Sequence, residues 1–431
     1  MRTVRYGSAE WRRYLAGLPR SSRPRPAIER AVAGVLRAVR REGDRALVRY
    51  TGRFDGVRVS TASLHAPARW VRAQADRADG PVVDALREMA RRVESFHRRQ
   101  LDRGFRVRLG ADGVLEEVVR PLDSVGLYVP GGAGAYPSSV LMNAIPARVA
   151  AVPRIVVVTP PRTLESNPAV AAALVLAGLD GSVFRVGGAQ AVAALAYGTR
   201  TVPRVAKIVG PGNAYVAAAK RQVRGLVETD TDAGPSEVVV LADDSADAGW
   251  VAADLLAQAE HGSGDETAVL VTPSAALGRE VAGLVALGIP SVANAAAARR
   301  ALRRNGAVVL VAGPDEGVAA VNDLAPEHAQ VMTRSAAAVA RRIVAGAVFV
   351  GGNTPVAVGD YGIGPNHVLP TGGTARHASP LSVRDFQRRQ SVVRLSRAGL
   401  RRVAPGVAVI ARAEGFRGHA QSVLTRFEGR S

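Results

Sequence analysis

The sequence predicts an α/β protein, and two observations lead to that class. From about Val125 onward, short β-branched runs alternate with alanine-rich segments of helical spacing, which is the pattern of parallel α/β layers. The alternation then divides near Gly234 and Pro235 into two stretches of the same rhythm. We therefore expect two similar, incomplete Rossmann-like units, with an N-terminal helical region before them and a C-terminal helical tail after them. The length of 431 residues also indicates more than one packed unit.

The individual elements follow from the apolar spacing along the chain. Residues 1 to about 110 have helical spacing, which is clearest over Ile28–Val39 and Val82–Phe96. Predicted strands then occupy residues 155–159, 183–186, 205–209, 238–241, 268–272, 307–311 and 348–350. Beyond Pro380 the spacing becomes helical again, over Val383–Arg389 and Val407–Phe427. A helical tail after a finished α/β body favours docking on a second subunit.

The composition excludes several kinds of site. The chain has no cysteine, so it can form no disulfide, thiolate nucleophile or cysteine-ligated zinc site. Any metal must be held by histidine, carboxylate or amide oxygen. The N-terminal sequence is charged throughout and lacks the apolar core of a signal peptide, and no apolar run is long enough to cross a bilayer. We expect a cytoplasmic protein with no membrane partner.

The positive charge raises the question of nucleic-acid binding. The formal net charge is +20 and the pI is near 11.3. However, Lys207 and Lys220 are the only lysines, and the arginines are spread through the chain, which is typical of biased codon usage. Aromatic residues make up only 4% of the chain, so platforms for stacking bases are scarce. We expect no nucleic-acid partner, and a basic binding or scaffold protein remains only an alternative.

Three glycine-rich turns follow strand-like runs, at Tyr128–Tyr136, Val186–Gln190 and Val209–Asn213. Glycines between a strand and a helix let backbone amides approach a ligand, and the helix N-terminus favours an anion there. The strict G-x-G-x-x-G fingerprint is absent from the chain. Each turn by itself is explained by a tight connection between elements, but three in one half of an α/β body make a nucleotide or phosphate site an equal alternative.

Histidines and carboxylates gather in the last part of the chain. Gln258 and His261 have the i, i+3 spacing that places both side chains on one helix face, although His261 before Gly262 also suits a helix C-terminus. Glu327 and His328 stand side by side just after a proline. Further candidates are Asp360 and His367 in a long glycine-rich loop, and Glu414 and His419 in the tail. Two histidines, a carboxylate and an amide oxygen suit zinc or a similar ion.

At this point the motifs resemble those of the histidinol dehydrogenase family. The resemblance runs from about Phe54-Asp-Gly56 to the end of the chain, with many motifs in the same order. The matching motifs are Pro130-Gly-Gly, Leu141-Met-Asn-Ala-Ile-Pro-Ala147, Gly187-Gly-Ala-Gln-Ala191, Gly210-Pro-Gly-Asn213, Ala233-Gly-Pro-Ser-Glu237, Gln258-Ala-Glu-His-Gly262, Ala325-Pro-Glu-His328, Gly359-Asp-Tyr361, Asn366-His-Val-Leu-Pro-Thr371, and Glu414 with His419.

The resemblance implies an NAD-dependent, four-electron oxidation of L-histidinol through histidinaldehyde to L-histidine, the last step of histidine biosynthesis. It implies His328 as the general base in alcohol oxidation and Glu327 as the residue that activates water for the aldehyde. It also implies further roles by position. One Zn²⁺ per subunit would be held by Gln258, His261, Asp360 and His419. These four residues would also contact the substrate, together with Ser236, His328, His367 and Glu414. NAD would be contacted by Tyr128, Gln190 and Asn213.

The resemblance also implies a homodimer in which the tail completes the active site of the partner. Combined with the patterns above, it predicts four regions. These are an N-terminal helical segment (1–24), a discontinuous α/β domain with the metal and catalytic residues (25–127 and 236–380), a cofactor-binding α/β domain (128–235) and a swapped helical tail (381–431).

The sequence departs from the family pattern at two places. Acidic residues, among them Asp232, stand before the Gly-Pro-Ser-Glu motif where apolar residues are usual, and Pro380 replaces a usual glycine. Neither position is a proposed ligand or catalytic residue. An alternative function is therefore a related zinc and NAD dehydrogenase acting on another small alcohol, such as a sulfonated diol.

Overall fold

The computed structural model describes residues 1–19, 26–132, 136–230 and 234–428. The chain forms two compact units, one from residues 1–100 and 122–386 and the other from residues 101–121 and 387–431. In the parts of the chain covered by these ranges, no helix has the length and apolar character needed to cross a membrane. The candidate residues 258–367 all belong to the larger unit, which is described first.

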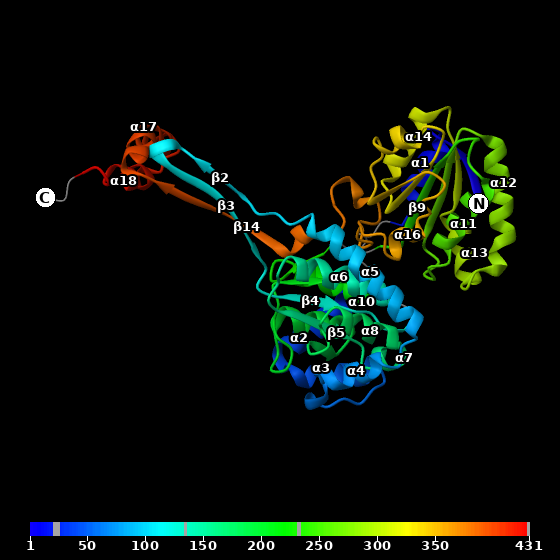
Figure 1. Cartoon of the computed structure of the whole chain (residues 1–431), viewed down its shortest axis with the longest axis horizontal. Coiled ribbons are helices and arrows are strands. Elements are labelled where there is room, and N and C mark those ends of the chain that lie inside the picture. Colours follow the sequence, from blue (N-terminus) through cyan, green and yellow to red (C-terminus); the bar gives the residue numbers. More distant parts are fainter. Residues whose placement is uncertain (20–25, 133–135, 231–233, 429–431) are drawn as a thin grey trace. The chain divides into compact units, whose positions relative to one another are not determined.

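The larger unit contains two parallel sheets (Figure 1). The first is built from β4 (Val125–Tyr128), β5 (Ile155–Thr159), β6 (Val183–Arg185), β7 (Lys207–Val209) and β8 (Glu228–Thr229), in the order β6-β5-β4-β7-β8. The second sheet has the order β1-β11-β10-β9-β12-β13. Its strands are β1 (Arg2–Arg5), β9 (Glu237–Ala242), β10 (Thr267–Thr272), β11 (Ala307–Leu310), β12 (His328–Met332) and β13 (Ala347–Val350).

Apart from β1, the two sheets have the same topology. In each, the first strand lies centrally, the second and third follow on one side, and the fourth and fifth follow on the other. All registered pairs in both sheets are parallel, for example Val125 with Ile155 and His328 with Val238. The order reverses between β4 and β7, and again between β9 and β12. Such switch points are where open α/β sheets bind ligands. The expectation of two similar Rossmann-like units is confirmed.

Helices cover both faces of the first sheet, and its strands are therefore buried on both sides. Leu127 and Val157 pack with α5 and α6 in one core, whereas Val156 and Val158 pack with α2 and α9 in another. The helices that belong to this half are α2 (Pro26–Glu42), α3 (Asp44–Phe54), α4 (Ala68–Ala75), α5 (Gly80–Arg98), α6 (Pro137–Val149), α7 (Thr163–Ser166), α8 (Pro168–Leu176), α9 (Gly188–Tyr197) and α10 (Ala214–Val223).

The second sheet is buried in the same way. Val240 packs with α11, α12 and α13 on one face, and Val239 packs with α1 and α14 on the other. The surrounding helices are α1 (Ala9–Gly17), α11 (Ala248–Ala259), α12 (Ala275–Gly288), α13 (Ala295–Arg304), α14 (Pro314–Leu324), α15 (Ala336–Ala340) and α16 (Ala357–Asp360).

This packing corrects the predicted domain boundaries. Residues 25–100 were expected to join residues 236–380, but their helices bury their apolar faces on the first sheet, with Val32 against α9 and Met89 against α6. Residues 1–24 were expected to be helical. They contain α1, but they begin with β1, which extends the second sheet beside β11.

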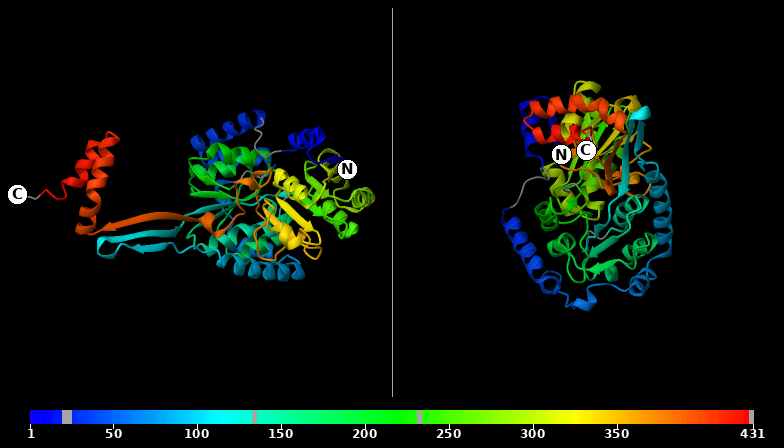
Figure 2. Two further views of the ribbon diagram at one scale, coloured as in Figure 1. Left: turned by 90° about the horizontal axis from the view of Figure 1, so that it is seen from above. Right: turned by 90° about the vertical axis from the view of Figure 1, so that its left-hand side faces the viewer.

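The smaller unit is a three-stranded antiparallel sheet with two helices. β2 (Phe105–Arg108), β3 (Gly113–Pro121) and β14 (Gln387–Leu395) run side by side, as the cyan and orange strands in Figure 2 show. α17 (Arg397–Ala413) and α18 (Arg417–Leu424) follow. The tail is thus helical only after residue 396. The predicted helix over 383–389 is wrong, because residues 383–386 form a short 3₁₀ turn and β14 then begins.

Candidate active site

The catalytic candidates stand where two neighbouring strands of the second sheet begin. α14 ends at Leu324, and Ala325 takes a left-handed conformation with φ 45°, which turns the chain toward β12. Glu327 follows Pro326, and His328 is the first residue of β12. Glu327 and His328 are 6% and 3% exposed. The helix-to-strand turn therefore places an acid and an imidazole inside the protein at the amino end of the sheet.

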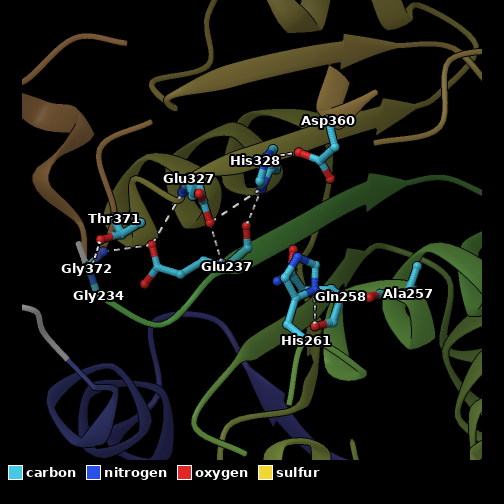
Figure 3. A network of polar contacts seen from close by, with 10 residues as sticks. All are labelled: Gly234, Glu237, Ala257, Gln258, His261, Glu327, His328, Asp360, Thr371 and Gly372. Carbon is cyan, nitrogen blue, oxygen red and sulfur yellow. Dashed lines mark hydrogen bonds and ion pairs between the residues drawn. The ribbon is translucent and has the colours of Figure 1, made fainter. Parts of the chain in front are cut away.

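Glu327 and Glu237 hold one another through backbone amides (Figure 3). The Glu237 N–H donates to Glu327 Oε2 at 3.0 Å, and the Glu327 N–H donates to Glu237 Oε2 at 3.3 Å. The Gly372 N–H donates to the same Glu237 oxygen at 3.1 Å. Because β9 and β12 are adjacent, this reciprocal pairing fixes both carboxylates. Sequence reasoning did not single out Glu237, although it ends the Gly-Pro-Ser-Glu motif.

The hydrogen bond of His328 determines which ring nitrogen is free. His328 Nδ1 lies 3.1 Å from the carbonyl oxygen of Glu237, so Nδ1 carries the proton and donates to that oxygen. Nε2 is then left as the basic nitrogen, and it lies 3.9 Å from Asp360 Oδ1. The imidazole also lies within 3.6 Å of the Glu327 carboxylate. The backbone thus orients His328 as a base.

Burial changes the proton affinity of both groups. Desolvation raises the pKa of the Glu327 carboxyl to about 7, although hydrogen bonds from the Glu237 amide and from Ser236 act in the opposite direction. Desolvation also lowers the pKa of the His328 imidazole, against the pull of Asp360. Near neutral pH His328 is therefore an uncharged base, and Glu327 exchanges a proton readily.

Gln258 and His261 are brought to this region by α11. Gln258 lies in the last turn of α11 and is 3% exposed, and His261 follows the end of the helix. His261 Nδ1 is 3.1 Å from the Gln258 carbonyl oxygen, which leaves Nε2 free. His261 is near enough to Glu327 to lower the pKa of that carboxyl. Gln258 and His261 therefore lie together at the end of α11, in the same region of the second sheet as Glu327 and His328 (Figure 3).

The glycine-rich loop supplies Asp360 and His367. Asp360 ends α16, and its carbonyl oxygen accepts a hydrogen bond from His367 Nδ1 at 3.0 Å. His367 Nε2 lies 3.3 Å from Ser139 Oγ. Burial lowers the pKa of His367 while Asp360 raises it. His328 and His367 line a common cavity of about 490 Å³, and Pro380 also lines it.

A second, larger cavity lies at the carboxyl ends of the first sheet. Its volume is about 1080 Å³, and Tyr128, Gln190 and Asn213 all line it. The Tyr128 hydroxyl accepts a hydrogen bond from the Gly188 N–H at 3.1 Å. Neither side-chain polar atom of Gln190 has a hydrogen-bond partner among the described residues, although the residue is 1% exposed. The cavity thus combines the predicted glycine turns with the unpaired side-chain amide of Gln190. Residues 133–135 of the first turn lie outside the described part.

The turn at Gly210 is held by a buried ion pair. Lys220 Nζ lies 2.6 Å from Asp230 Oδ1, and both side chains are 6% exposed. Lys220 also donates to the Gly210 carbonyl oxygen, and Asp230 Oδ2 accepts from the Gly210 N–H at 2.7 Å. Gly210 has φ +113°, and a Cβ there would collide with the Tyr128 carbonyl oxygen. The acidic segment before Gly234 thus contributes a structural ion pair through Asp230, while Asp232 lies outside the described residues.

The remaining two candidates belong to the smaller unit. Glu414 caps the C-terminal end of α17, and His419 lies in α18, where its ring stacks on Phe416 at 4.9 Å between centroids. Both residues are exposed. Within the ranges described, no three His, Asp or Glu side chains gather as a metal-binding cluster.

A Rossmann-like sheet with a glycine-lined cavity at its switch point, together with a second sheet that carries a buried, uncharged imidazole, is the arrangement of a dinucleotide-dependent oxidoreductase. The histidinol dehydrogenase family model matches residues 18–427. The chain therefore belongs to the histidinol dehydrogenase family, whose members are NAD-dependent oxidoreductases.

Individual relatives agree with this assignment. The chain is 46% identical to the histidinol dehydrogenase of Syntrophotalea carbinolica over 95% of each chain. It is also 46% identical to that of Rhizobium meliloti, over 93% of this chain and 92% of the relative. The crystal structure of the histidinol dehydrogenase from Elizabethkingia anophelis matches with a TM-score of 0.93 at 30% identity, covering 99% of this chain and 98% of that one.

Proposed function

We propose that the chain oxidises L-histidinol through histidinaldehyde to L-histidine, with two hydride transfers to NAD and one water consumed. The observation that carries the proposal is the buried pair of Glu327 and His328, whose environments suit two different proton transfers. An alcohol must lose a proton as hydride leaves its carbon, and an aldehyde must add water before it can lose a second hydride. The pair offers one group for each task.

His328 acts on the alcohol. Its Nδ1 is held by the Glu237 carbonyl oxygen at 3.1 Å, so Nε2 takes the hydroxyl proton while hydride moves to NAD. Burial keeps the imidazole uncharged and ready to accept that proton. A rigid, uncharged base suits the same function in the second oxidation, when the hydrated aldehyde must lose a proton again.

Glu327 acts on the water. A carboxyl with a pKa of about 7 is ionised in a large fraction of molecules at neutral pH and is more basic than an exposed glutamate. The Glu237 N–H holds one of its oxygens at 3.0 Å, which orients the carboxylate. It would take a proton from water as the oxygen attacks the aldehyde carbon, giving the hydrate that loses the second hydride.

Zinc fits the donors of this site. The Gln258 side chain is buried at the end of α11, and its amide oxygen is an N/O-type donor that zinc accepts. His261 follows it with Nε2 free. We propose Gln258, His261, Asp360 and His419 as ligands of one Zn²⁺ per subunit. When bound, zinc would anchor the imidazole and amine of the substrate away from the carbon that reacts.

The other proposed contacts are divided between the substrate and NAD. Ser236, His367 and Glu414 would contact the substrate, with His367 on the wall of the cavity that also contains His328. Tyr128, Gln190 and Asn213 would contact NAD in the larger cavity that they share. We also propose a homodimer in which the smaller unit of one chain brings Glu414 and His419 to the site of the other.

The proposed substrate is tested by NADH formation. Purified protein with zinc and NAD should reduce NAD with histidinol and with histidinaldehyde, and the final product should be histidine. A sulfonated diol and a simple primary alcohol serve as matched alternatives. Turnover of the diol in place of histidinol would reject the substrate while leaving the family chemistry intact.

A further inference from the structure

The larger cavity has a wall that the glycine turns do not build. Besides Tyr128 and the turns, it is lined by Ala31, Gly34 and Val35 of α2 and by residues at the end of α3. Ala31, Gly34 and Val35 share one helix face, and a Cβ at Gly34 would meet no atom within 4 Å. Small side chains therefore leave room for a ligand between α2 and the first sheet.

Asp55 is the acidic group of this wall. It caps the end of α3, where its N–H donates to the Thr51 carbonyl oxygen at 3.0 Å. Its Oδ2 atom is buried and has no hydrogen-bond partner in the portion of the chain that is described. Desolvation raises the pKa of the carboxyl. Burial is also the main cause of the raised pKa of Tyr128, to which the Asp55 charge adds. An unpaired carboxylate oxygen inside a cavity is a costly arrangement that a ligand with hydroxyl donors would relieve.

The position of the cavity indicates which part of the cofactor lies there. None of its described lining residues comes from residues 236–380, which carry His328 and Glu327. The nicotinamide ring must reach those residues for hydride transfer, so the cavity holds the part of NAD that does not react. Stacked rings of Tyr50 and Phe54, 5.4 Å apart, form an aromatic edge on the same wall. Such an edge suits an adenine base.

We propose that Asp55 accepts hydrogen bonds from the hydroxyl groups of the adenosine ribose and thereby makes the cavity select NAD over NADP. This inference rests on the proposed NAD-linked function. In the usual dinucleotide fold, an acid after the second strand binds the ribose hydroxyls and repels a 2′-phosphate. This chain lacks the usual glycine fingerprint, and α3 supplies the acid from outside the sheet. A 2′-phosphate at Asp55 would face a buried negative charge.

Binding of NAD, NADP and ADP-ribose to the whole protein, measured by calorimetry, tests the proposal. Asp55→Asn should weaken NAD and ADP-ribose about 10- to 100-fold, as expected for loss of a hydrogen bond to a charged group. Affinity for NADP should stay the same or increase, so that the preference for NAD falls. ADP-ribose is included because it lacks nicotinamide and reports on the adenosine half alone. Asp55→Ser provides a second variant if Asp55→Asn folds poorly, and thermal unfolding checks both.

Asp76→Asn is the matched control, because it removes the same charge from an exposed position at the end of α4. It should leave all three affinities unchanged. Equal weakening of NAD and NADP by Asp55→Asn, or an NAD-to-NADP preference within about twofold of the parent, would overturn the inference. A parent protein that prefers NAD through Asp55 but does not oxidise histidinol would reject only the proposed substrate.

Discussion

Glu327 and His328 are neighbours in the chain, and burial shifts their pKa values in opposite directions. Near neutral pH His328 is therefore uncharged and Glu327 is partly ionised, and both of these forms can accept a proton. Their proposed division of labour predicts the effect of Glu327→Gln. Because His328 alone serves the alcohol step, oxidation of histidinol to the aldehyde should be nearly unchanged. Oxidation of added histidinaldehyde should fall about 100- to 10,000-fold, the range for loss of a general base. Single-turnover NADH formation from each substrate measures the two steps, and an equal loss in both would refute the division.

The pKa of Glu327 predicts a pH dependence for the same step. Glutamate accepts a proton only when ionised, and burial has raised its pKa to about 7. Aldehyde oxidation should therefore increase as pH rises through about 7 and level off above it. Glu327→Gln, which cannot titrate, should lose this rise while keeping its low rate. A parent profile that stays flat from acidic to alkaline pH would show that the carboxylate does not act as the base.

At the scale of elements, the buried Lys220–Asp230 pair connects α10 and β8 to the Gly210 turn. Lys220→Met leaves Asp230 charged and buried, so the free energy of unfolding should fall by about 3–5 kcal/mol. NAD should also bind more weakly, because Gly212 and Asn213 beside this turn line the cavity. Urea unfolding and NAD titration measure the two effects. Arg49→Met, which breaks an exposed pair with Glu42, should leave the free energy of unfolding nearly unchanged.

α11 provides another test at this scale, since it presents Gln258 and His261 together. Metal analysis of purified His261→Ala and His419→Ala proteins should show strongly reduced zinc. His377→Ala is the control, because His377 is exposed after a short 3₁₀ turn and is not a proposed ligand. Its zinc content should equal that of the parent. Full zinc in either of the first two variants would remove that residue from the ligand set.

Seven of the strands in the described structure were absent from the predictions, namely β1, β2, β3, β4, β8, β12 and β14. For β1 and β14 the reason is a weak local signal. β1 spans only Arg2–Arg5, and three of its four residues are polar, so the sequence shows no clear alternation of apolar and polar residues there. β14 is rich in arginine and glutamine, and its strand form depends on pairing with β3 far away in the chain. The strands that were predicted, by contrast, are short apolar runs rich in β-branched residues, such as Ile155–Thr159. Propensity alone was enough for those strands.

At the scale of the whole molecule, the smaller unit has unburied apolar groups. Val393, Val409 and Ile410 are 64%, 64% and 61% exposed. Such side chains commonly mark a protein interface. They support the proposed dimer, in which each tail serves the active site of the other chain.

Subunit mixing tests this dimer. Inactive His328→Ala and His419→Ala proteins are combined and allowed to exchange chains. If the tail crosses over, a mixed dimer has one site with both lesions and one with neither, and activity should recover toward half of normal. Mass spectrometry of differently tagged chains verifies the exchange. Proven exchange without recovered activity would mean that each chain completes its own site.

The sequence by itself determined the α/β class, half of the described strands, the glycine turns and the helical spacing of Gln258 and His261, because hydrophobic periodicity and turn chemistry are local properties. The tertiary structure decided which helices cover which sheet and placed β1 and β14. It also brought Glu237 against Glu327 across 90 residues, and Asp55 to the wall of the larger cavity. These arrangements depend on burial and hydrogen bonds between distant segments, and no local pattern encodes such contacts.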